Sequence, residues 1–417
     1  MQTKNKSLVI ISLMALMSLS AYAQNSTNSP YTRYGYGRMS DHSVGAGRAM
    51  GGIGIGLRSP RQINPMNPAS YSSMDSMTFL FDFGATAQMS WFSDGTNKQR
   101  DFNGNVDYMA MQFPLHKQIA LSVGLLPFSS VGYSFFNSGE TDGLLYSEAY
   151  IGTGGINQLY GGLSVDVWKK RLAVGANLNY LFGNLNNGIT TGYGSSNPFS
   201  VINSRRLRVY DLDFDFGLQY THPVSKTDNL VVGLIFSPKN GLKNENIQTI
   251  SNGQTQTTAD TTTDRIYELP AEYGIGFTYA RDDKFIIAAD VSYQEWSKIT
   301  FNGATDNFND RLKIAAGFEY LPNLYSRPLY NRMRYRAGVN YTNSYINING
   351  NGYRELGASL GVGIPTTPLN NRISYINFSF EYVKILPDVK TMIREDYARI
   401  TLSYTFNELW FFKFKVN

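Results

Sequence analysis

Charged side chains recur at every second position in several stretches of the chain, a spacing that places them on one face of a strand. A guanidinium group binds a carboxylate in a two-pronged geometry, so a row of arginines could hold the acid group of an acyl ligand. The alternative, which we prefer, is that these charges pair with one another or with backbone carbonyls inside the protein. The residues are Asp211, Asp213 and Asp215, then Glu268 and Glu272, and finally Arg332, Arg334 and Arg336.

The same residues do not predict a metal site or a catalytic centre. Alternate strand residues lie about 7 Å apart, because each residue rises about 3.4 Å, so three aspartates in this pattern do not converge on one ion. We expect them to pair with Arg48, Arg58 or Arg61 instead. The 3 histidines are scattered, and the chain has neither a Gly-x-Ser-x-Gly elbow nor a histidine pair with metal-binding spacing. We therefore expect no enzyme activity, no metal and no cofactor.

The segments that carry these charges alternate apolar and polar residues, as strands with one apolar face do. The stretch with the three aspartates has an opposite face made only of apolar residues: Tyr210, Leu212, Phe214, Phe216, Leu218 and Tyr220. Comparable alternation runs through residues 172–182, 285–294 and 376–382. No segment keeps a helical period, so the sequence predicts an all-β protein.

About fourteen such segments follow one another, which predicts a transmembrane antiparallel β-barrel over residues 77–417. Short joins, expected to be periplasmic turns, alternate with long joins rich in Gly, Asn, Ser and Thr, expected to be external loops. This alternation weakens after about residue 320, so twelve or sixteen strands remain alternatives. The segments begin near residues 77, 105, 118, 156, 171, 205, 229, 266, 284, 310, 333, 353, 373 and 395.

Composition and the N-terminus favour export to a membrane. Residues 1–23 contain Lys4 and Lys6, an apolar run and Ala21-Tyr22-Ala23, which predicts a cleaved signal peptide. Tyr (29), Phe (25) and Gly (39) are abundant and charged residues make up only 17% of the chain, as suits a lipid-facing sheet with aromatic girdles. The net charge of +5 is modest and dispersed, so nucleic acid is not an expected partner. With 0 cysteines the chain has no disulfide.

Residues 24–76 behave differently from the rest of the chain. They are rich in Gly, Ser, Arg, Asn and Pro and show no alternation. One interpretation is a disordered leader, because such composition fits disorder. We prefer a plug, or hatch, that lies in the lumen of the barrel.

Two motifs in this segment resemble the hatch of the long-chain fatty acid transporter (FadL) family of Gram-negative outer membranes. The first is the Gly47-Arg48-Ala49 stretch among small residues, and the second is Asn67-Pro68-Ala69 just before the first strand. The resemblance implies a localisation in the outer membrane among its lipids and passive uptake of a hydrophobic ligand such as a long-chain fatty acid. It also implies gating by the plug and release through a lateral opening beside a kinked strand. Gly124, Pro127 and Gly132 supply a candidate kink; the alternative is an ordinary strand end at Pro127.

A second function remains open from sequence, because fold does not determine function. The barrel could be a non-transporting accessory or structural subunit of a larger outer-membrane complex for protein assembly or secretion, with other outer-membrane proteins as partners. Expected inward positions are mostly Gly, Ser, Asn and charged residues, which suits a plugged interior at least as well as an acyl-binding one.

The chain ends with aromatic residues alternating with lysines, a pattern expected of a last strand that carries the assembly signal. We predict that deletion of residues 410–417 blocks membrane insertion. Heat-modifiable protein in the membrane fraction, compared with the full chain, measures this; wild-type amounts would contradict the prediction.

Overall fold

The computed structural model describes residues 27–409 except for short gaps at 142, 194–198, 253–254, 262–265, 306–307 and 367–372. The expected signal peptide and the residue 410–417 tail lie outside the described residues.

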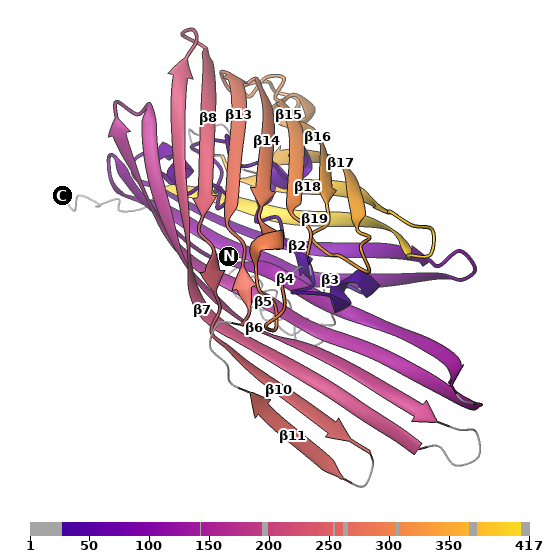
Figure 1. The fold of residues 1–417 in the computed structure, drawn as a ribbon. Coiled ribbons are helices and arrows are strands. Elements are labelled where there is room, and N and C mark those ends of the chain that lie inside the picture. Colours follow the sequence, from indigo (N-terminus) through magenta and orange to yellow (C-terminus); the bar gives the residue numbers. More distant parts are fainter. Residues whose placement is uncertain are drawn as a thin grey trace, which may run out of the picture.

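Fourteen strands form a closed antiparallel ring. Figure 1 shows how these strands surround the lumen. The ring closes because β19 pairs with β2 along its whole length, from Arg394↔Ser93 to Leu409↔Thr78. The predicted strand number and fold class are therefore confirmed. In chain order the strands are β2 (Thr78–Ser93), β3 (Lys98–His116), β4 (Ile119–Thr141), β5 (Leu144–Trp168), β6 (Leu172–Tyr193), β7 (Phe199–Pro223), β8 (Asp228–Ser237), β13 (Glu272–Arg281), β14 (Phe285–Gln294), β15 (Arg311–Tyr320), β16 (Arg334–Asn343), β17 (Tyr353–Pro365), β18 (Tyr375–Pro387) and β19 (Arg394–Leu409).

The outer wall of the ring is apolar, because alternate residues of each strand point outward. A closed barrel also satisfies its backbone hydrogen bonds internally, which is what a bilayer requires. The exposed side chains include Leu178, Leu212, Phe214, Phe216, Leu234, Phe277, Ile287, Ile314, Phe318, Leu360, Phe380 and Leu402. Among the described residues, no helix is both long and apolar enough to cross a membrane. The wall has the architecture of an outer-membrane β-barrel.

Several strands are longer than the sequence predicted. β5 begins at Leu144 rather than near residue 156, and β7 begins at Phe199 rather than near 205. The stretches expected as external loops instead continue the ladder, with β4 paired to β5 as far as Thr141↔Leu144. Their Gly, Asn, Ser and Thr content suggested loops, but backbone pairing between two adjacent extended segments does not require apolar side chains. The long strands β4 to β7 slant away from the ring in Figure 1.

Several shorter strands and helices are not part of the ring. β10 (Asn244–Ser251) continues the sheet by pairing with β7, and β11 (Gln256–Thr261) pairs with β10. A two-stranded sheet joins β9 (Asn240–Gly241) to β12 (Glu268–Leu269). The eighth predicted segment therefore splits, since β13 begins only at Glu272. Two short helices complete this set: η5 (Trp296–Lys298) and α2 (Leu329–Arg332).

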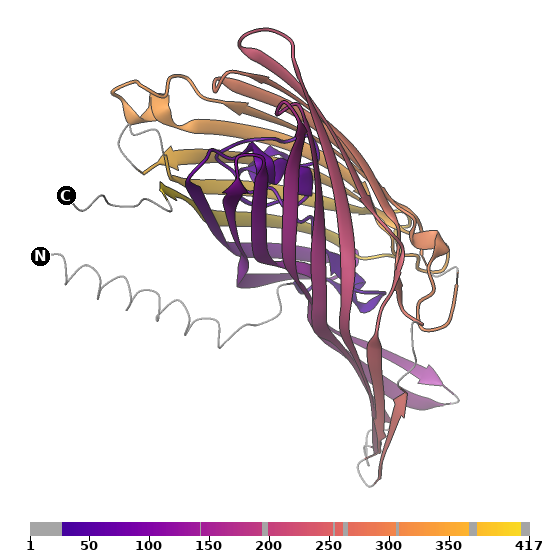
Figure 2. The same cartoon turned by 90° about the vertical axis from the view of Figure 1, so that its left-hand side faces the viewer.

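The N-terminal segment, residues 27–77, lies inside the ring. It contains η2 (Pro30–Arg33), β1 (Arg38–Met39), η3 (Gly45–Met50) and η4 (Pro68–Ser73). Its residues contact inward-facing side chains from strands on different sides of the ring, for example Tyr108 on β3, Asp166 on β5 and Asp290 on β14. Figure 2 shows this indigo segment within the barrel wall.

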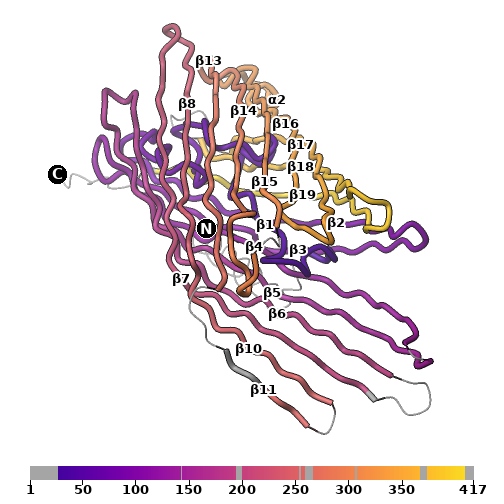
Figure 3. Tube along the Cα trace, in the orientation of Figure 1, coloured from indigo at the N-terminus to yellow at the C-terminus, as the bar shows by residue number. Residues whose placement is uncertain are grey.

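The wall separates between β3 and β4. These two strands pair only from Met109↔Leu125 to His116↔Ile119. Beyond that point β4 pairs with β5 on one side, and with the two residues of β1 on the other. The β4–β5 register shifts between Pro127 and Ser129, as expected where a proline cannot donate to the ladder. Figure 3 shows β1 beside β4 at this place.

We call the end of the barrel with the β3–β4, β5–β6, β7–β8 and β13–β14 turns the short-turn end, and the opposite end the long-loop end. At the long-loop end an aromatic core packs around the N-terminal segment. Tyr36 is completely buried, with its ring 6.0 Å from Trp296. Trp296 in turn stacks on Tyr345 at 4.2 Å. This core covers the lumen from that side.

We predict that Trp296→Ala lowers the free energy of unfolding by about 3–5 kcal/mol, the usual loss when a large buried aromatic side chain is truncated. Urea unfolding of the barrel in lipid vesicles measures it. The matched control is Trp168→Ala, because that side chain lies at the other end and is 47% exposed. Equal losses in the two variants would contradict a packed core at the long-loop end.

Candidate functional site: the occupied lumen

A single carboxylate of the wall, Asp290 on β14, binds three consecutive backbone N–H groups of the N-terminal segment. Gly54 and Ile55 donate to Oδ2 at 2.6 and 2.8 Å, and Gly56 donates to Oδ1 at 3.4 Å. Successive N–H groups that converge in this way form an anion-binding nest. The approach requires small residues on both sides, because a Cβ on Gly276 of the wall would lie 2.4 Å from the Gly56 nitrogen.

The Gly-Arg-Ala stretch forms η3 and is buried in the lumen. The Arg48 side chain donates to the Ser43 carbonyl at 2.8 Å and forms an ion pair with Asp107 of β3. A Cβ on Gly47 would lie 2.7 Å from the Ile53 backbone oxygen, so only glycine fits there. Ala49 is 2% exposed. These three residues fold the segment on itself and tie it to β3.

The Asn-Pro-Ala motif begins η4 and fixes it to the wall. Asn67 Oδ1 accepts from the Ala69 N–H at 3.1 Å, which caps the helix, and Asn67 Nδ2 donates to the Ile55 carbonyl at 2.8 Å. The Pro68 backbone lies so close to β6 that a Cβ on Gly175 would be 2.4 Å from its carbonyl carbon. The motif thus joins two parts of the N-terminal segment and packs them against the wall.

Three more ion pairs hold the segment. Arg58 binds Asp166 of β5 at 2.6 Å, and Arg61 binds Asp283 in the β13–β14 turn at 2.7 Å. Asp41 lies 3.1 Å from Lys313 of β15. Burial alone would raise the pKa of Asp41, but Lys313 and Arg311 more than offset this, so its pKa lies below the ordinary value.

The acidic stripe of β7 does not pair with Arg48, Arg58 or Arg61, whose partners are the carboxylates named above. That expectation was wrong because those arginines face other strands, whereas the stripe faces polar groups that lie nearby. Asp215 accepts from Asn179 at 2.7 Å and Ser237 at 2.6 Å, Asp213 accepts from Asn240 at 3.3 Å, and Asp211 accepts from the Lys243 N–H at 2.9 Å.

The two glutamates expected on one inward face are separated by the structure. Glu272 begins β13 and accepts from Gln294 at 2.8 Å. Glu268 belongs to β12 instead, where it lies 2.8 Å from Lys239 and accepts from the Thr300 N–H at 2.6 Å. Neither carboxylate is placed to bind a ligand together with the other.

The basic stripe is divided in a similar way. Arg334 and Arg336 on β16 both bind Glu319 of β15, Arg336 through its Nε at 2.6 Å. Glu319 is 1% exposed, so the two guanidinium groups share one buried carboxylate. Arg332 lies outside the strand, at the end of α2. The structure thus uses these arginines within the wall, as in the interpretation we preferred.

The candidate kink residues lie where β4 leaves β3. Gly124 still pairs with Ala110 of β3, whereas Pro127 lies at the register shift. Gly132 lies further along, and its N–H donates to Thr32 of the N-terminal segment at 3.1 Å. A cavity of about 120 Å³ adjoins this place, and many of its lining residues are charged: Arg38, Asp41, Arg48, Asp107, Arg311, Glu355, Glu381 and Arg399.

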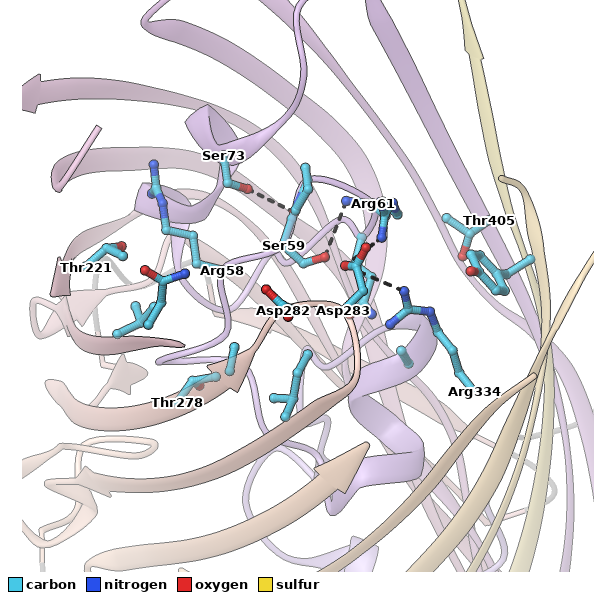
Figure 4. A pocket seen from close by; sticks show the side chains of 18 of the residues that line it. Arg58, Ser59, Arg61, Ser73, Thr221, Thr278, Asp282, Asp283, Arg334 and Thr405 are labelled. Carbon is cyan, nitrogen blue, oxygen red and sulfur yellow. Dashed lines mark hydrogen bonds and ion pairs between the residues drawn. The ribbon is translucent and has the colours of Figure 1, made fainter. Parts of the chain in front are cut away.

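A larger cavity, about 330 Å³, lies at the short-turn end and is lined by residues of the N-terminal segment and of the wall. Figure 4 shows its charged lining, with Arg61 and Arg334 both directed at Asp283. Arg58 and Lys170 also line it. Its wall is polar and charged, which suits water or an ionic group more than a hydrocarbon.

Sequence reasoning did not single out Asp290, Asp166 or Glu319. Each of them is a carboxylate at an inward position of an alternating strand, and each is nearly or fully buried. Because an ionisable group cannot face lipid cheaply, such positions are a usable signal for contacts in the lumen. What the alternation could not supply was the partner of each carboxylate.

Solved structures with the same fold are hydrocarbon channels and related transporters. The CymD monoaromatic hydrocarbon channel superposes with a TM-score of 0.58 at 16% identity, over 87% of this chain and 97% of that one. The Ralstonia pickettii toluene transporter TbuX gives 0.57 at 16%, over 87% and 97%. A Pseudomonas aeruginosa FadL homologue gives 0.57 at 14%, over 89% and 99%. At these identities the likeness establishes a FadL-like fold.

The sequence itself gives a narrower assignment. A search of curated proteins finds no match. A protein-family profile described as BamG matches residues 5–417, which is nearly the whole sequence. The chain therefore belongs to the BamG family.

Proposed function

We propose that this protein is a closed, non-transporting barrel that serves as a structural subunit of a larger protein assembly in the Gram-negative outer membrane. In this proposal the N-terminal segment is a permanent plug, and the short-turn end faces the periplasm. The observation that carries it is the set of buried and partly buried contacts that tie the segment to the wall. They come from several sides of the ring, through Asp107, Asp166, Asp290 and Lys313.

A passage through the lumen would have to break the contacts between the N-terminal segment and the wall. A buried ion pair that loses one partner costs about 3–5 kcal/mol, because a charge is left without compensation. The Arg58–Asp166 pair and the Asp290 nest are both buried, so moving the segment aside exposes several such groups together. A plug that gates by ordinary thermal motion would need weaker attachments.

The polarity of the interior supports the same proposal. A site for a hydrophobic molecule is lined mostly by apolar side chains. The cavities of about 330 and 120 Å³ inside the barrel have several charged lining residues each, and a third of about 90 Å³ includes Asp213, Asp215 and Glu272. By contrast, an apolar cavity of about 800 Å³, lined by residues such as Phe216 and Tyr273, lies on the lipid-facing wall.

A second candidate function is passive uptake of hydrophobic compounds such as long-chain fatty acids, with gating by the plug and lateral release. The separation of β3 from β4 beside Pro127 favours it, because a lateral exit needs an interruption of the wall. The fold shared with a monoaromatic hydrocarbon channel favours it too. Against it, the cavity next to the separation is lined by several ion-pairing side chains.

The two functions are distinguished by purifying the protein in mild detergent at its native expression level. Mass spectrometry then identifies co-purifying proteins and bound lipids. A ligand-free barrel in stoichiometric complex with other outer-membrane proteins is the expected result. A lone barrel that carries one hydrophobic molecule per chain would overturn the proposal in favour of uptake.

We predict that Asp290→Ala loosens the plug. The variant leaves the Gly54 and Ile55 N–H groups buried without an acceptor, and hydrogen bonds to a charged group contribute about 1.5–3 kcal/mol each. Ion conductance in planar bilayers should rise from near zero in the wild type. Asp94→Ala in the exposed β2–β3 turn is the matched control and should stay closed. A wild-type barrel that already conducts ions would contradict a permanent plug.

We further predict that Arg336→Ala destabilises the barrel without affecting fatty-acid binding, because its guanidinium binds Glu319 and not a ligand. The free energy of unfolding should fall by about 1.5–3 kcal/mol, as for the loss of a hydrogen bond to a charged group, because Arg334 still compensates the Glu319 charge. Binding of radiolabelled oleate to purified wild-type and variant barrels measures the second part. Saturable oleate binding that is lost in the variant would show that the arginine holds a ligand carboxylate.

A further inference from the structure

The β5–β6 turn at the short-turn end has an unfavourable backbone for its residues. It contains a β-turn over residues 168–171, in which the Arg171 N–H donates to the Trp168 carbonyl at 2.7 Å, between the paired residues Trp168 and Leu172. Its central residues, Lys169 and Lys170, have φ angles of 44° and 58°. Asn-Gly is favoured at such positions, whereas a side chain such as lysine costs roughly 1–2 kcal/mol in each. Strain of this kind is often retained at functional sites.

The two lysines are part of a positively charged rim. The neighbouring turns at the short-turn end also present exposed basic side chains, so basic residues extend from the end of β3 to the β7–β8 turn. We call the following residues the basic rim: His116, Lys117, Lys169, Lys170, Arg171 and Lys226. In the same turns Asp228 is paired with Arg281, and Asp75 lies exposed just before β2. Asp282 and Asp283 lie in the β13–β14 turn.

Lys170 connects this rim to the interior, because it also lines the 330 Å³ cavity at the short-turn end. The cavity has five basic lining residues, Arg58, Arg61, Lys170, Arg334 and Arg336, and three acidic ones, Asp166, Asp282 and Asp283. Arg58 and Arg61 are held by Asp166 and Asp283, and the other two arginines bind Glu319. Lys170 is therefore the exposed cation at the mouth that is placed to meet an incoming group.

The cavity wall also holds buried polar atoms that lack a partner within the described part of the chain. They are Oδ2 of Asp166, which is 3% exposed, the Thr278 hydroxyl, which is 2% exposed, and the Thr221 hydroxyl. All three residues line the cavity. An unsatisfied acceptor and unsatisfied hydroxyls in the wall of one cavity suit a peptide backbone, which brings both N–H groups and carbonyls.

We propose that the basic rim and the cavity behind it dock an acidic peptide segment of a periplasmic partner protein. Acidic side chains of the segment meet Lys169 and Lys170, and its backbone enters the cavity towards Asp166 and Thr278. This inference rests on the proposed function, since it names the site and the chemistry of a partner in that assembly. Complementary charge mainly raises the association rate and the specificity of such a contact.

An anionic lipid headgroup is the main rival for the same charges. Lipids reach the rim from outside the ring, where they could meet Lys117 or Lys226. Lys170 lines the interior cavity instead, together with residues of the N-terminal segment such as Arg58. This position favours a peptide that approaches the mouth of the barrel.

The test uses the full chain in nanodiscs of zwitterionic phosphatidylcholine and a fluorescein-labelled peptide of six glutamates. The variant is Lys169→Asn with Lys170→Gly, which removes both charges and installs residues that this turn geometry favours. Its fold should therefore be at least as stable as that of the wild type. The control is Lys98→Asn with Lys390→Asn, which removes two exposed lysines at the long-loop end.

We expect saturable binding, measured by fluorescence anisotropy, that the variant weakens at least tenfold and the control leaves unchanged. Equal binding in all three proteins, or none to the wild type, would overturn the proposal. A wild type that binds no peptide but retains phosphatidylglycerol, which the variant does not retain, would show that the rim contacts lipid. The proposal would again be wrong. A native complex that forms with the Lys169→Asn, Lys170→Gly variant refutes only this docking site, whereas absence of any complex in the wild type refutes the proposed function.

Discussion

The arrangement of this molecule depends on one carboxylate that is inside a membrane barrel and must be satisfied there. Asp290 cannot face lipid, and it finds its partners in the backbone of Gly54, Ile55 and Gly56. These hydrogen bonds satisfy both partners. The carboxylate gains donors, and the N–H groups of a segment with little regular structure gain an acceptor. A stretch without strands or long helices can be buried only if its backbone is paired in some such way. The wall therefore needs the N-terminal segment for hydrogen-bond donors, and the segment needs the wall for acceptors.

Glycine makes that mutual dependence possible on both surfaces. Gly233 of β8 and Gly338 of β16 approach the N-terminal segment so closely that a Cβ on either would lie about 2 Å from its backbone, at the Ile55 oxygen (2.0 Å) and the Gly51 nitrogen (2.1 Å) respectively. Gly51 itself has a φ of 76°, which other residues rarely adopt. The abundance of glycine thus has a structural reason in addition to loop formation. Close backbone contact excludes water and any ligand from these parts of the lumen.

The sequence predicted the wall well and the interior poorly, for a physical reason. Alternation follows from the pleat of a strand, so residues such as Leu212 and Phe214 could be assigned to the lipid-facing side and fourteen strands could be counted. Strand ends were less accurate, because ladders such as Thr141↔Leu144 extend beyond the bilayer, where apolar alternation is no longer needed. Partners across the lumen, such as Arg58 with Asp166, depend on how the N-terminal segment is oriented. That orientation is set by all its contacts together and leaves no local pattern in the sequence.

The short pairing of β3 with β4 gives the ring a mechanical asymmetry. A closed barrel under lateral stress opens where the fewest backbone bonds must break, and that place is here and not at the junction of the first and last strands, which are bonded along their whole length. The two chain-terminal strands of the wall are thus firmly joined, while a seam lies between two strands that are adjacent in sequence and connected by a tight turn. The two strands can separate at the long-loop end, while the turn holds them together at the short-turn end. Because β1 pairs with β4 and Arg48 forms an ion pair with Asp107 of β3, the N-terminal segment contacts both strands of the seam and holds the wall as well as filling the lumen.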